Sequence, residues 1–210
     1  MRIDRDRDAF LAIDVQNDFS TGGALAVPDG DAVVAPVNAL MALFSHVVAT
    51  QDWHPAGHAS FAASHPGAAP FSVVEMPYGR QTLWPVHCVQ GTPGAGFHPG
   101  FALDRATAIV RKGWRAQVDS YSAFFENDRK TPTGLNGLVR ERGVTRVFLA
   151  GLATDFCVSF SALDARRLGF EVFVVLDACR AIDLDGSLSA AREAWRAEGI
   201  AVVEASEIVV

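Results

Sequence analysis

The sequence is short of cysteine, of long apolar runs and of basic charge, and each shortage argues against a class of protein. Its three cysteines, at positions 88, 157 and 179, have no CxxC spacing, so we expect no disulfide framework and a cytoplasmic location. No apolar run is long enough for a bilayer, and the charged N-terminus is unlike a signal peptide. The net charge of −6 argues against nucleic-acid binding and favours a small, neutral or weakly charged partner.

Short apolar runs occupy much of the chain. Hydrophobic residues make up 50% of its 210 residues, enough for one sizeable core, so residues 1–210 are expected to form a single domain. The runs are near-continuous rather than alternating, which is typical of parallel strands covered on both faces. They span residues 9–13, 47–50, 106–110, 146–150, 171–176 and 200–203.

Helical patterns separate these runs and complete the prediction of the fold. They cover about 31–45, 133–143, 155–168 and 186–198. The last has Asp185 as a candidate N-cap and Gly199 just beyond its end. Repeated βα units favour an α/β fold with three layers, α/β/α, around a doubly wound, mainly parallel, six-stranded sheet.

A loop-rich segment at about 52–100 interrupts this pattern. It is rich in Pro, Gly, His and Trp and has no clear period. So long a stretch of weak structure inside a compact domain is more often functional than a linker. Ligands of parallel sheets bind beyond the carboxyl ends of the strands. The positions to inspect are therefore Asp14, Asp52, Lys112 and the residues after Ala150.

Cys157 is the most informative single residue. It follows the strand at 146–150 in the segment Gly151-Leu-Ala-Thr-Asp-Phe-Cys157. Thr154 is a candidate helix cap, which places Cys157 in the first turn. A helix start lowers a thiol pKa and offers N–H groups to an oxyanion. A small buried apolar residue is the alternative, and position alone leaves the two even. Cys88 and Cys179 lack this context and are interpreted as structural.

Two further strand-end residues and one cluster carry possible chemistry. Asp14 is either a structural cap or a catalytic acid or base, and Lys112 alone would be a solvated strand end. Asp52 and His54 alternate along an extended segment, so both side chains can reach one ion, together with His87. Two histidines and one carboxylate suit zinc, iron or manganese. His58 is either a fourth ligand or a supporting contact.

Together these residues resemble the isochorismatase-like cysteine hydrolase superfamily and, within it, the nicotinamidases. The resemblance runs through nearly the whole chain, and the Asp-Trp-His and Trp-Pro-x-His-Cys pair is its most specific part. The segments that carry it are Ile13-Asp-Val-Gln-Asn-Asp-Phe19, Gln51-Asp-Trp-His-Pro-Ala-Gly-His58, Leu83-Trp-Pro-Val-His-Cys88, Arg111-Lys-Gly113, Asp119-Ser-Tyr-Ser-Ala-Phe124 and Gly151-Leu-Ala-Thr-Asp-Phe-Cys-Val158.

The resemblance implies an isochorismatase-like fold and a set of roles. It implies hydrolysis of nicotinamide to nicotinate and ammonia through a cysteine thioester, and a divalent metal, with zinc favoured, that takes up the pyridine nitrogen. It also implies a cis peptide between Leu152 and Ala153. The implied roles are a catalytic triad of Asp14, Lys112 and Cys157, an oxyanion hole from the N–H groups of Ala153 and Cys157, metal ligands Asp52, His54 and His87, and substrate contacts Phe19, Trp84 and Tyr121.

Two alternatives stay open at this point. One is another amide or ureide hydrolase of the same superfamily, and the other is a non-catalytic binding protein on the same fold. Bound metal together with activity on nicotinamide would argue against the first alternative. Ammonia release in an assay would argue against the second. The sequence leaves open which metal is bound, whether the chain forms a homo-oligomer, and whether it acts on related carboxamides such as pyrazinamide.

Overall fold

The computed structural model describes all 210 residues, and its centre is one parallel sheet of six strands. The strand order is β5-β2-β1-β6-β7-β8, and every neighbouring pair is parallel. The strands are β1 (Asp8–Ile13), β2 (His46–Asp52), β5 (Ala108–Lys112), β6 (Arg146–Leu152), β7 (Glu171–Arg180) and β8 (Ala201–Val203). The predicted six-stranded parallel sheet is confirmed.

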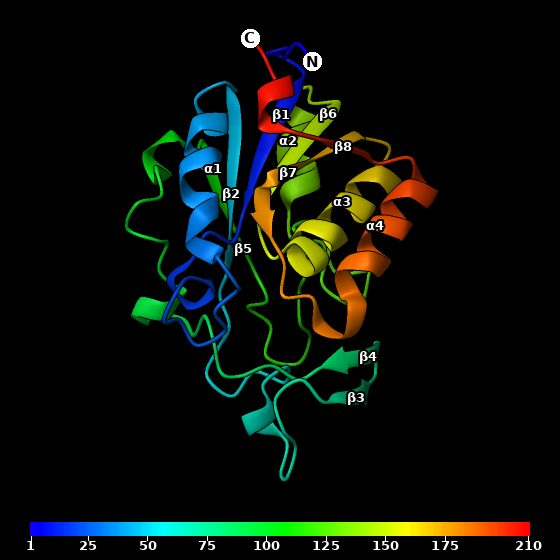
Figure 1. The fold of residues 1–210 in the computed structure, drawn as a ribbon. Coiled ribbons are helices and arrows are strands. Elements are labelled where there is room, and N and C mark those ends of the chain that lie inside the picture. Colours follow the sequence, from blue (N-terminus) through cyan, green and yellow to red (C-terminus); the bar gives the residue numbers. More distant parts are fainter.

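Helices cover both faces of the sheet. Helix α1 (Val34–Met41) lies on one face, and α3 (Ser159–Arg167) and α4 (Ser187–Glu198) lie on the other (Figure 1). A shorter helix, α2 (Leu135–Glu141), precedes β6. This is the predicted three-layer arrangement. None of the helices has both the length and the apolar character needed to cross a bilayer.

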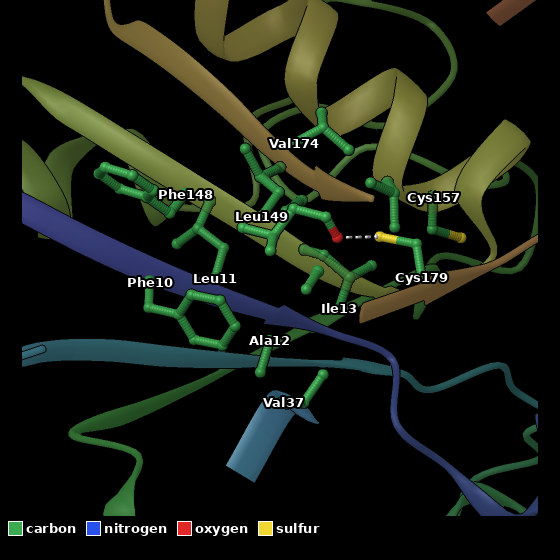
Figure 2. Close-up of a cluster of buried hydrophobic side chains, with 14 of the residues drawn as sticks. Phe10, Leu11, Ala12, Ile13, Val37, Phe148, Leu149, Cys157, Val174 and Cys179 are labelled. Carbon is green, nitrogen blue, oxygen red and sulfur yellow. Dashed lines mark hydrogen bonds between the residues drawn. The ribbon is translucent and has the colours of Figure 1, made fainter. Parts of the chain in front are cut away.

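The core forms where the apolar runs meet the helices. All six residues of β1 are buried, as expected for a central strand covered on both faces. Aromatic rings extend the contact across the sheet, with Phe148 stacked on Phe173 at a centroid distance of 4.6 Å. Cys179 belongs to this core (Figure 2), and its Sγ donates to the carbonyl of Val175 at 3.2 Å. This environment agrees with the structural interpretation of Cys179.

The strand order reverses at β1 and thereby locates the crevice. From β1 the chain adds β2 and then β5 on one side, and it returns to add β6 on the other. Ligands of doubly wound sheets bind at the carboxyl ends of the strands next to such a reversal. The residues that follow β1 and β6 are Asp14 and Ala153, four positions before Cys157.

The loop-rich segment lies across this carboxyl edge, at the bottom of Figure 1. It is more ordered than its sequence indicates, because it contains an antiparallel hairpin of β3 (Val73–Met76) and β4 (Gly79–Thr82). Each strand has only four residues, too few for a clear alternation of apolar and polar side chains. The turn at Pro77 and Tyr78, followed by Gly79 at φ 114°, is the signal that could have indicated the hairpin.

Three local predictions are wrong in detail. The first helix starts at Val34 and not near residue 31, because a 3-10 turn from Gly30 to Val33 precedes it. Thr154 does not cap the helix after β6, since Ala153 is the N-cap and makes no side-chain cap bond. Asp185 does not cap α4, whose N-cap is Gly186 at φ 80°. In both cases the backbone conformation, rather than a side-chain oxygen, starts the helix.

Candidate active site and metal centre

The three predicted triad residues come from three different strands and lie together in the interior. Asp14 follows β1, Lys112 ends β5, and Cys157 lies in a π-helical turn, Thr154–Val158, after β6. Lys112 Nζ is 2.9 Å from Asp14 Oδ2 and 3.4 Å from Cys157 Sγ. Asp14 and Lys112 are fully buried, and Cys157 is 7% exposed. A solvated strand end is therefore excluded for Lys112.

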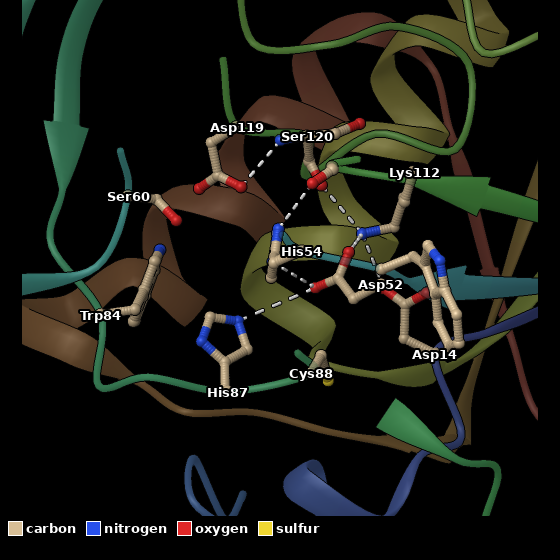
Figure 3. A network of polar contacts seen from close by, with 12 residues as sticks. Asp14, Asp52, His54, Ser60, Trp84, His87, Cys88, Lys112, Asp119 and Ser120 are labelled. Atoms are coloured by element: carbon tan, nitrogen blue, oxygen red, sulfur yellow. Dashed lines mark hydrogen bonds and ion pairs between the residues drawn. The ribbon is translucent and has the colours of Figure 1, made fainter. Parts of the chain in front are cut away.

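Asp52 is a second carboxylate on the same ammonium group. Its Oδ1 accepts a hydrogen bond from Lys112 Nζ (Figure 3), because Asp52 and Lys112 are register partners on β2 and β5. The ammonium group also donates to the carbonyl of Ser120 at 2.9 Å and to Cys157 Sγ at 3.4 Å. The sequence indicates Asp52 only as a metal ligand, since a strand register is not readable from one chain segment.

The charges of this cluster balance one another incompletely. Burial disfavours the charged form of Lys112, but Asp14 and Asp52 outweigh it and raise the pKa of the amine well above its ordinary value. Burial is the largest influence on Asp52 and opposes its ionisation, yet Lys112, His54 and His87 together outweigh burial and lower that pKa. For Asp14 burial prevails over Lys112, and the pKa is raised. Two carboxylates thus share one permanent cation.

The same imbalance acts on the thiol. Burial raises the pKa of Cys157 well above its ordinary value, with Lys112 opposing and the two carboxylates adding to the rise. The lowered thiol pKa expected from the helix start is therefore wrong. The physical reason is that a buried thiolate would add a second excess negative charge. The thiol keeps its proton until a neighbouring base takes it.

The predicted metal ligands form a second cluster that shares Asp52. The other oxygen of this residue, Oδ2, lies 3.6 Å from His54 Nε2 and 3.9 Å from His87 Nε2. All three side chains are buried, and their donor atoms lie within 4.8 Å of one another. Ligands about 2.0–2.2 Å from a tetrahedral ion are separated by roughly 3.3–3.6 Å. The spacing fits a divalent ion after small adjustments.

The other ring nitrogens of the two histidines support the same reading. His54 Nδ1 is 2.8 Å from the carbonyl of Gly113, and His87 Nδ1 is 2.8 Å from the carbonyl of Pro85. A carbonyl requires a protonated Nδ1, which leaves the Nε2 lone pair of a neutral ring directed at the shared space. Gly113 has φ 64°, and a Cβ there would lie 2.5 Å from the His54 ring. The close contact between this backbone and the ring therefore requires glycine.

The two imidazoles differ in their electrostatic surroundings. Burial and the neighbouring His54 lower the pKa of His87 to about 4, so its ring is neutral at pH 7. Burial acts in the same direction on His54, but Asp52 outweighs it and raises that pKa. A metal ion would compete with the proton for the Nε2 atom of His54.

His58 is not positioned as a ligand of this cluster. Its Nδ1 is 2.7 Å from Ser60 Oγ, and its Nε2 is 2.9 Å from the carbonyl of Arg115. Both nitrogens are occupied, while the ring packs on His54 with 4.4 Å between centroids. Of the two alternatives left open by the sequence, the structure favours the supporting contact.

One pocket connects the two clusters. Cys157 and Ala153 lie in its wall, together with the metal-cluster residues Asp52 and His87. The predicted substrate contacts Phe19, Trp84 and Tyr121 all line it, and Trp84 Nε1 donates to the Tyr121 hydroxyl at 3.1 Å. The peptide between Leu152 and Ala153 is cis, as predicted. The remaining lining residues were missed: Leu25, Asp119, Phe156 and Ile182.

Gln16 is a further residue that sequence reasoning missed. Its Oε1 accepts the N–H of Asp52 at 2.7 Å, and its Nε2 donates to the carbonyl of the same residue at 2.9 Å. Nε2 also donates to the carbonyl of Ala95, in the loop-rich segment, at 2.9 Å. A fully buried amide thus holds the backbone of the residue shared by both clusters. Its place in the polar segment after β1 is the only signal in the sequence.

A buried cysteine, carboxylate and lysine at the switch point of a doubly wound sheet define a hydrolase-like site, and the comparison with known families agrees. The isochorismatase domain family matches residues 8–207. This chain belongs to that family.

The chain is similar to a nicotinamidase, to a protein whose structure holds nicotinate and to a pyrazinamidase. A nicotinamidase of Acinetobacter baylyi is 48% identical over 202 residues, which cover 96% of this chain and 94% of that protein. The structure of PnC1 from L. infantum in complex with nicotinate is 40% identical with a TM-score of 0.87, covering 100% of this chain and 98% of that one. A pyrazinamidase of Pyrococcus horikoshii in complex with zinc is 35% identical with a TM-score of 0.77, covering 94% and 99%.

Proposed function

We propose that this chain, as a single isochorismatase-like domain, hydrolyses nicotinamide to nicotinate and ammonia through a thioester on Cys157. One observation carries the proposal: the thiol and the metal cluster face one narrow pocket with aromatic walls. A flat heteroaromatic ring between those walls would present its carboxamide to the thiol and its ring nitrogen to the metal side. The nicotinamidases to which the chain is similar, and the neighbour in complex with nicotinate, support this substrate.

The chemistry at the carboxamide uses the three strand-end residues. Asp14 accepts the thiol proton, and the thiolate forms a bond to the amide carbon. The N–H groups of Ala153 and Cys157 hold the oxygen that becomes negative, and one such donor typically contributes about 10²–10³ in rate. Asp14 gives the proton to the nitrogen of the former amide, and the C–N bond breaks. Ammonia departs, and the acyl group remains on Cys157 as a thioester.

The second half-reaction repeats these roles with water. Asp14 takes a proton from the water, whose oxygen forms a bond to the thioester carbon. The C–S bond then breaks, nicotinate is released, and the sulfur recovers its proton from Asp14. Lys112 keeps its charge throughout and holds both carboxylates in place, since its Nζ contacts Asp14 and Asp52.

Asp52, His54 and His87 would hold the metal. Two imidazoles and one carboxylate suit zinc best, with iron and manganese as alternatives; the zinc in the Pyrococcus horikoshii pyrazinamidase supports this choice. When bound, the ion supplies a Lewis-acid contact for the ring nitrogen and so orients the ring. Orientation of this kind can lower the activation free energy by several kcal/mol. Pyrazinamide has the same carboxamide and a ring nitrogen, and we propose it as a second substrate.

The test is ammonia release by the purified protein from nicotinamide and from benzamide, which has the same shape but no ring nitrogen. We expect turnover of nicotinamide, loss of turnover after chelation, recovery with zinc, and poor turnover of benzamide. Equal rates on both amides would contradict recognition of the ring nitrogen. No ammonia from nicotinamide with metal-loaded protein would contradict the proposed function itself.

A further inference from the structure

Thr50 makes two contacts to Asp14 from the neighbouring strand. It lies on β2, two residues before Asp52, and is fully buried. Its hydroxyl donates to Asp14 Oδ1 at 2.6 Å and accepts the backbone N–H of Asp14 at 3.1 Å. One hydroxyl therefore holds both the carboxylate and the backbone of this residue.

The two oxygens of Asp14 have different surroundings as a result. Oδ1 is occupied by the Thr50 hydroxyl. Oδ2 is buried, forms an ion pair with Lys112 Nζ at 2.9 Å and has no hydrogen-bond partner. The donor atoms of Asp14, Asp52 and Cys157 lie within 4.8 Å of one another. Lys112 Nζ contacts both Oδ2 and Cys157 Sγ, so Oδ2 lies on the side of the carboxyl group toward the thiol.

A carboxyl group can rotate about the bond that joins it to Cβ. In this pocket a rotation out of the present plane would break the hydrogen bond to Thr50 and leave a buried polar group without a partner, which typically costs about 1–3 kcal/mol. Hydrogen bonds to a carboxylate are also stronger than those between neutral groups. The Thr50 hydroxyl therefore favours one orientation of the carboxyl group.

We propose that Thr50 is a positioning residue for the proposed reaction: it holds Oδ1 of Asp14 so that Oδ2 receives the proton of Cys157. The inference rests on the proposed function and adds a residue outside the triad to it. Thr50 does not line the pocket, and both hydrogen bonds of its hydroxyl go to Asp14, so it acts through Asp14. Proton transfer occurs twice in each half-reaction, so a misdirected carboxylate slows turnover without weakening binding of the ring.

The experiment compares Thr50→Val, which keeps the shape and removes the hydroxyl, with Thr50→Ser, which keeps the hydroxyl. We expect kcat of the metal-loaded Thr50→Val protein to fall by about 10–100-fold, with KM and metal content within about twofold of wild type. Thr50→Ser should recover most of kcat. Thr107→Val is the matched control, because the Thr107 hydroxyl also bonds to a backbone group, the carbonyl of Val47, but lies away from the pocket.

A structural role would give a different result. If Thr50 only ties β2 to the segment after β1, Thr50→Val should have a lower melting temperature, a lower metal content and a higher KM, or Thr50→Ser should fail to restore kcat. Either outcome overturns the inference, as does an unchanged kcat. In each case the proposed function still stands if the wild-type protein hydrolyses nicotinamide.

A second measurement keeps the inference separate from the substrate. Alkylation of Cys157 by iodoacetamide needs the thiol proton to be removed, whatever the natural amide is. Slower alkylation in Thr50→Val than in Thr50→Ser and wild type would support the positioning role even if nicotinamide were not hydrolysed. Equal rates in all three proteins would overturn it.

Discussion

The two ends of the pocket are built in different ways. At the thiol end, Lys112 is the last residue of a strand of the central sheet, and Asp14 and the turn with Cys157 follow strands closely, so the sheet itself sets their positions. At the metal end, His54 and His87 come from the loop-rich segment, and carbonyl contacts orient both rings. Regular structure positions one end, and individual hydrogen bonds position the other.

The two ends nevertheless share charge. Asp52 contributes one oxygen to Lys112 and the other to the histidines, and Gln16 holds its backbone. A change in Lys112 should therefore affect both ends, whereas changes in Cys157 or His54 should affect one. The following substitutions test that separation.

Cys157→Ala should have the largest effect on turnover. Removal of the proposed nucleophile is expected to lower kcat by at least about 10⁴-fold, because no neighbouring group can form the thioester. The proposed metal ligands come from other segments, so metal content should equal that of wild type by elemental analysis. Cys88→Ala is the control, and it should retain most activity. Ammonia release by Cys157→Ala at more than a small fraction of the wild-type rate would refute the covalent mechanism.

Lys112→Met should damage both ends and the fold. It leaves the buried carboxylates of Asp14 and Asp52 without their cation, and breaking a buried ion pair in this way typically costs about 3–5 kcal/mol. We expect lower free energy of unfolding in urea, weaker metal binding and loss of turnover. Arg111→Met, at the exposed neighbouring position, should be close to wild type in all three. Normal metal affinity in Lys112→Met would show that the two ends are independent.

His54→Ala should affect only the metal end. We expect metal affinity to fall by more than the 10–100-fold that is typical for loss of a supporting contact, together with a large rise in KM for nicotinamide. Cys157 should still react with iodoacetamide, since its neighbours are unchanged. His98→Ala, outside the pocket, serves as the control. Unchanged metal content in His54→Ala would contradict the ligand assignment.

Glu126→Gln should give the smallest effect, a change in how stability depends on pH. Glu126 lies on the segment that also brings Ser120 and Asp119 to the two ends. Burial raises its pKa to about 7, although Arg115, at 2.7 Å, opposes the rise. At pH values between the ordinary pKa of a glutamate and about 7, Glu126 is therefore protonated in the folded protein and ionised in the unfolded chain.

The sign follows from this difference. The contribution of Glu126 to stability is fully present below the ordinary pKa of a glutamate and is lost as the pH rises through about 7. The melting temperature should be measured between about pH 5 and 8, which brackets this loss. It should fall less steeply with pH for Glu126→Gln than for wild type. Parallel curves for the two proteins would show that Glu126 ionises normally.

Much of the fold was predictable because strands and helices are local patterns. The apolar run at 9–13 coincides with β1, and the run at 146–150 lies within β6. The hairpin at Val73–Thr82 was not predicted, because four-residue strands with mixed exposure carry no period. The caps at Thr154 and Asp185 were wrong because positive-φ or extended backbone can start a helix without a side-chain acceptor.

The sequence by itself determined which chemical groups are available and at which strand ends they stand: a carboxylate after the first strand, an ammonium group at the third, and a thiol in a helix start after the fourth. Tertiary structure alone decided what these groups do to one another. The register of β2 and β5 places Lys112 between Asp14 and Asp52, and burial then raises the pKa of Cys157 instead of lowering it. Strand ends are local, whereas the distance between charges and their exclusion from water depend on segments far apart in the chain.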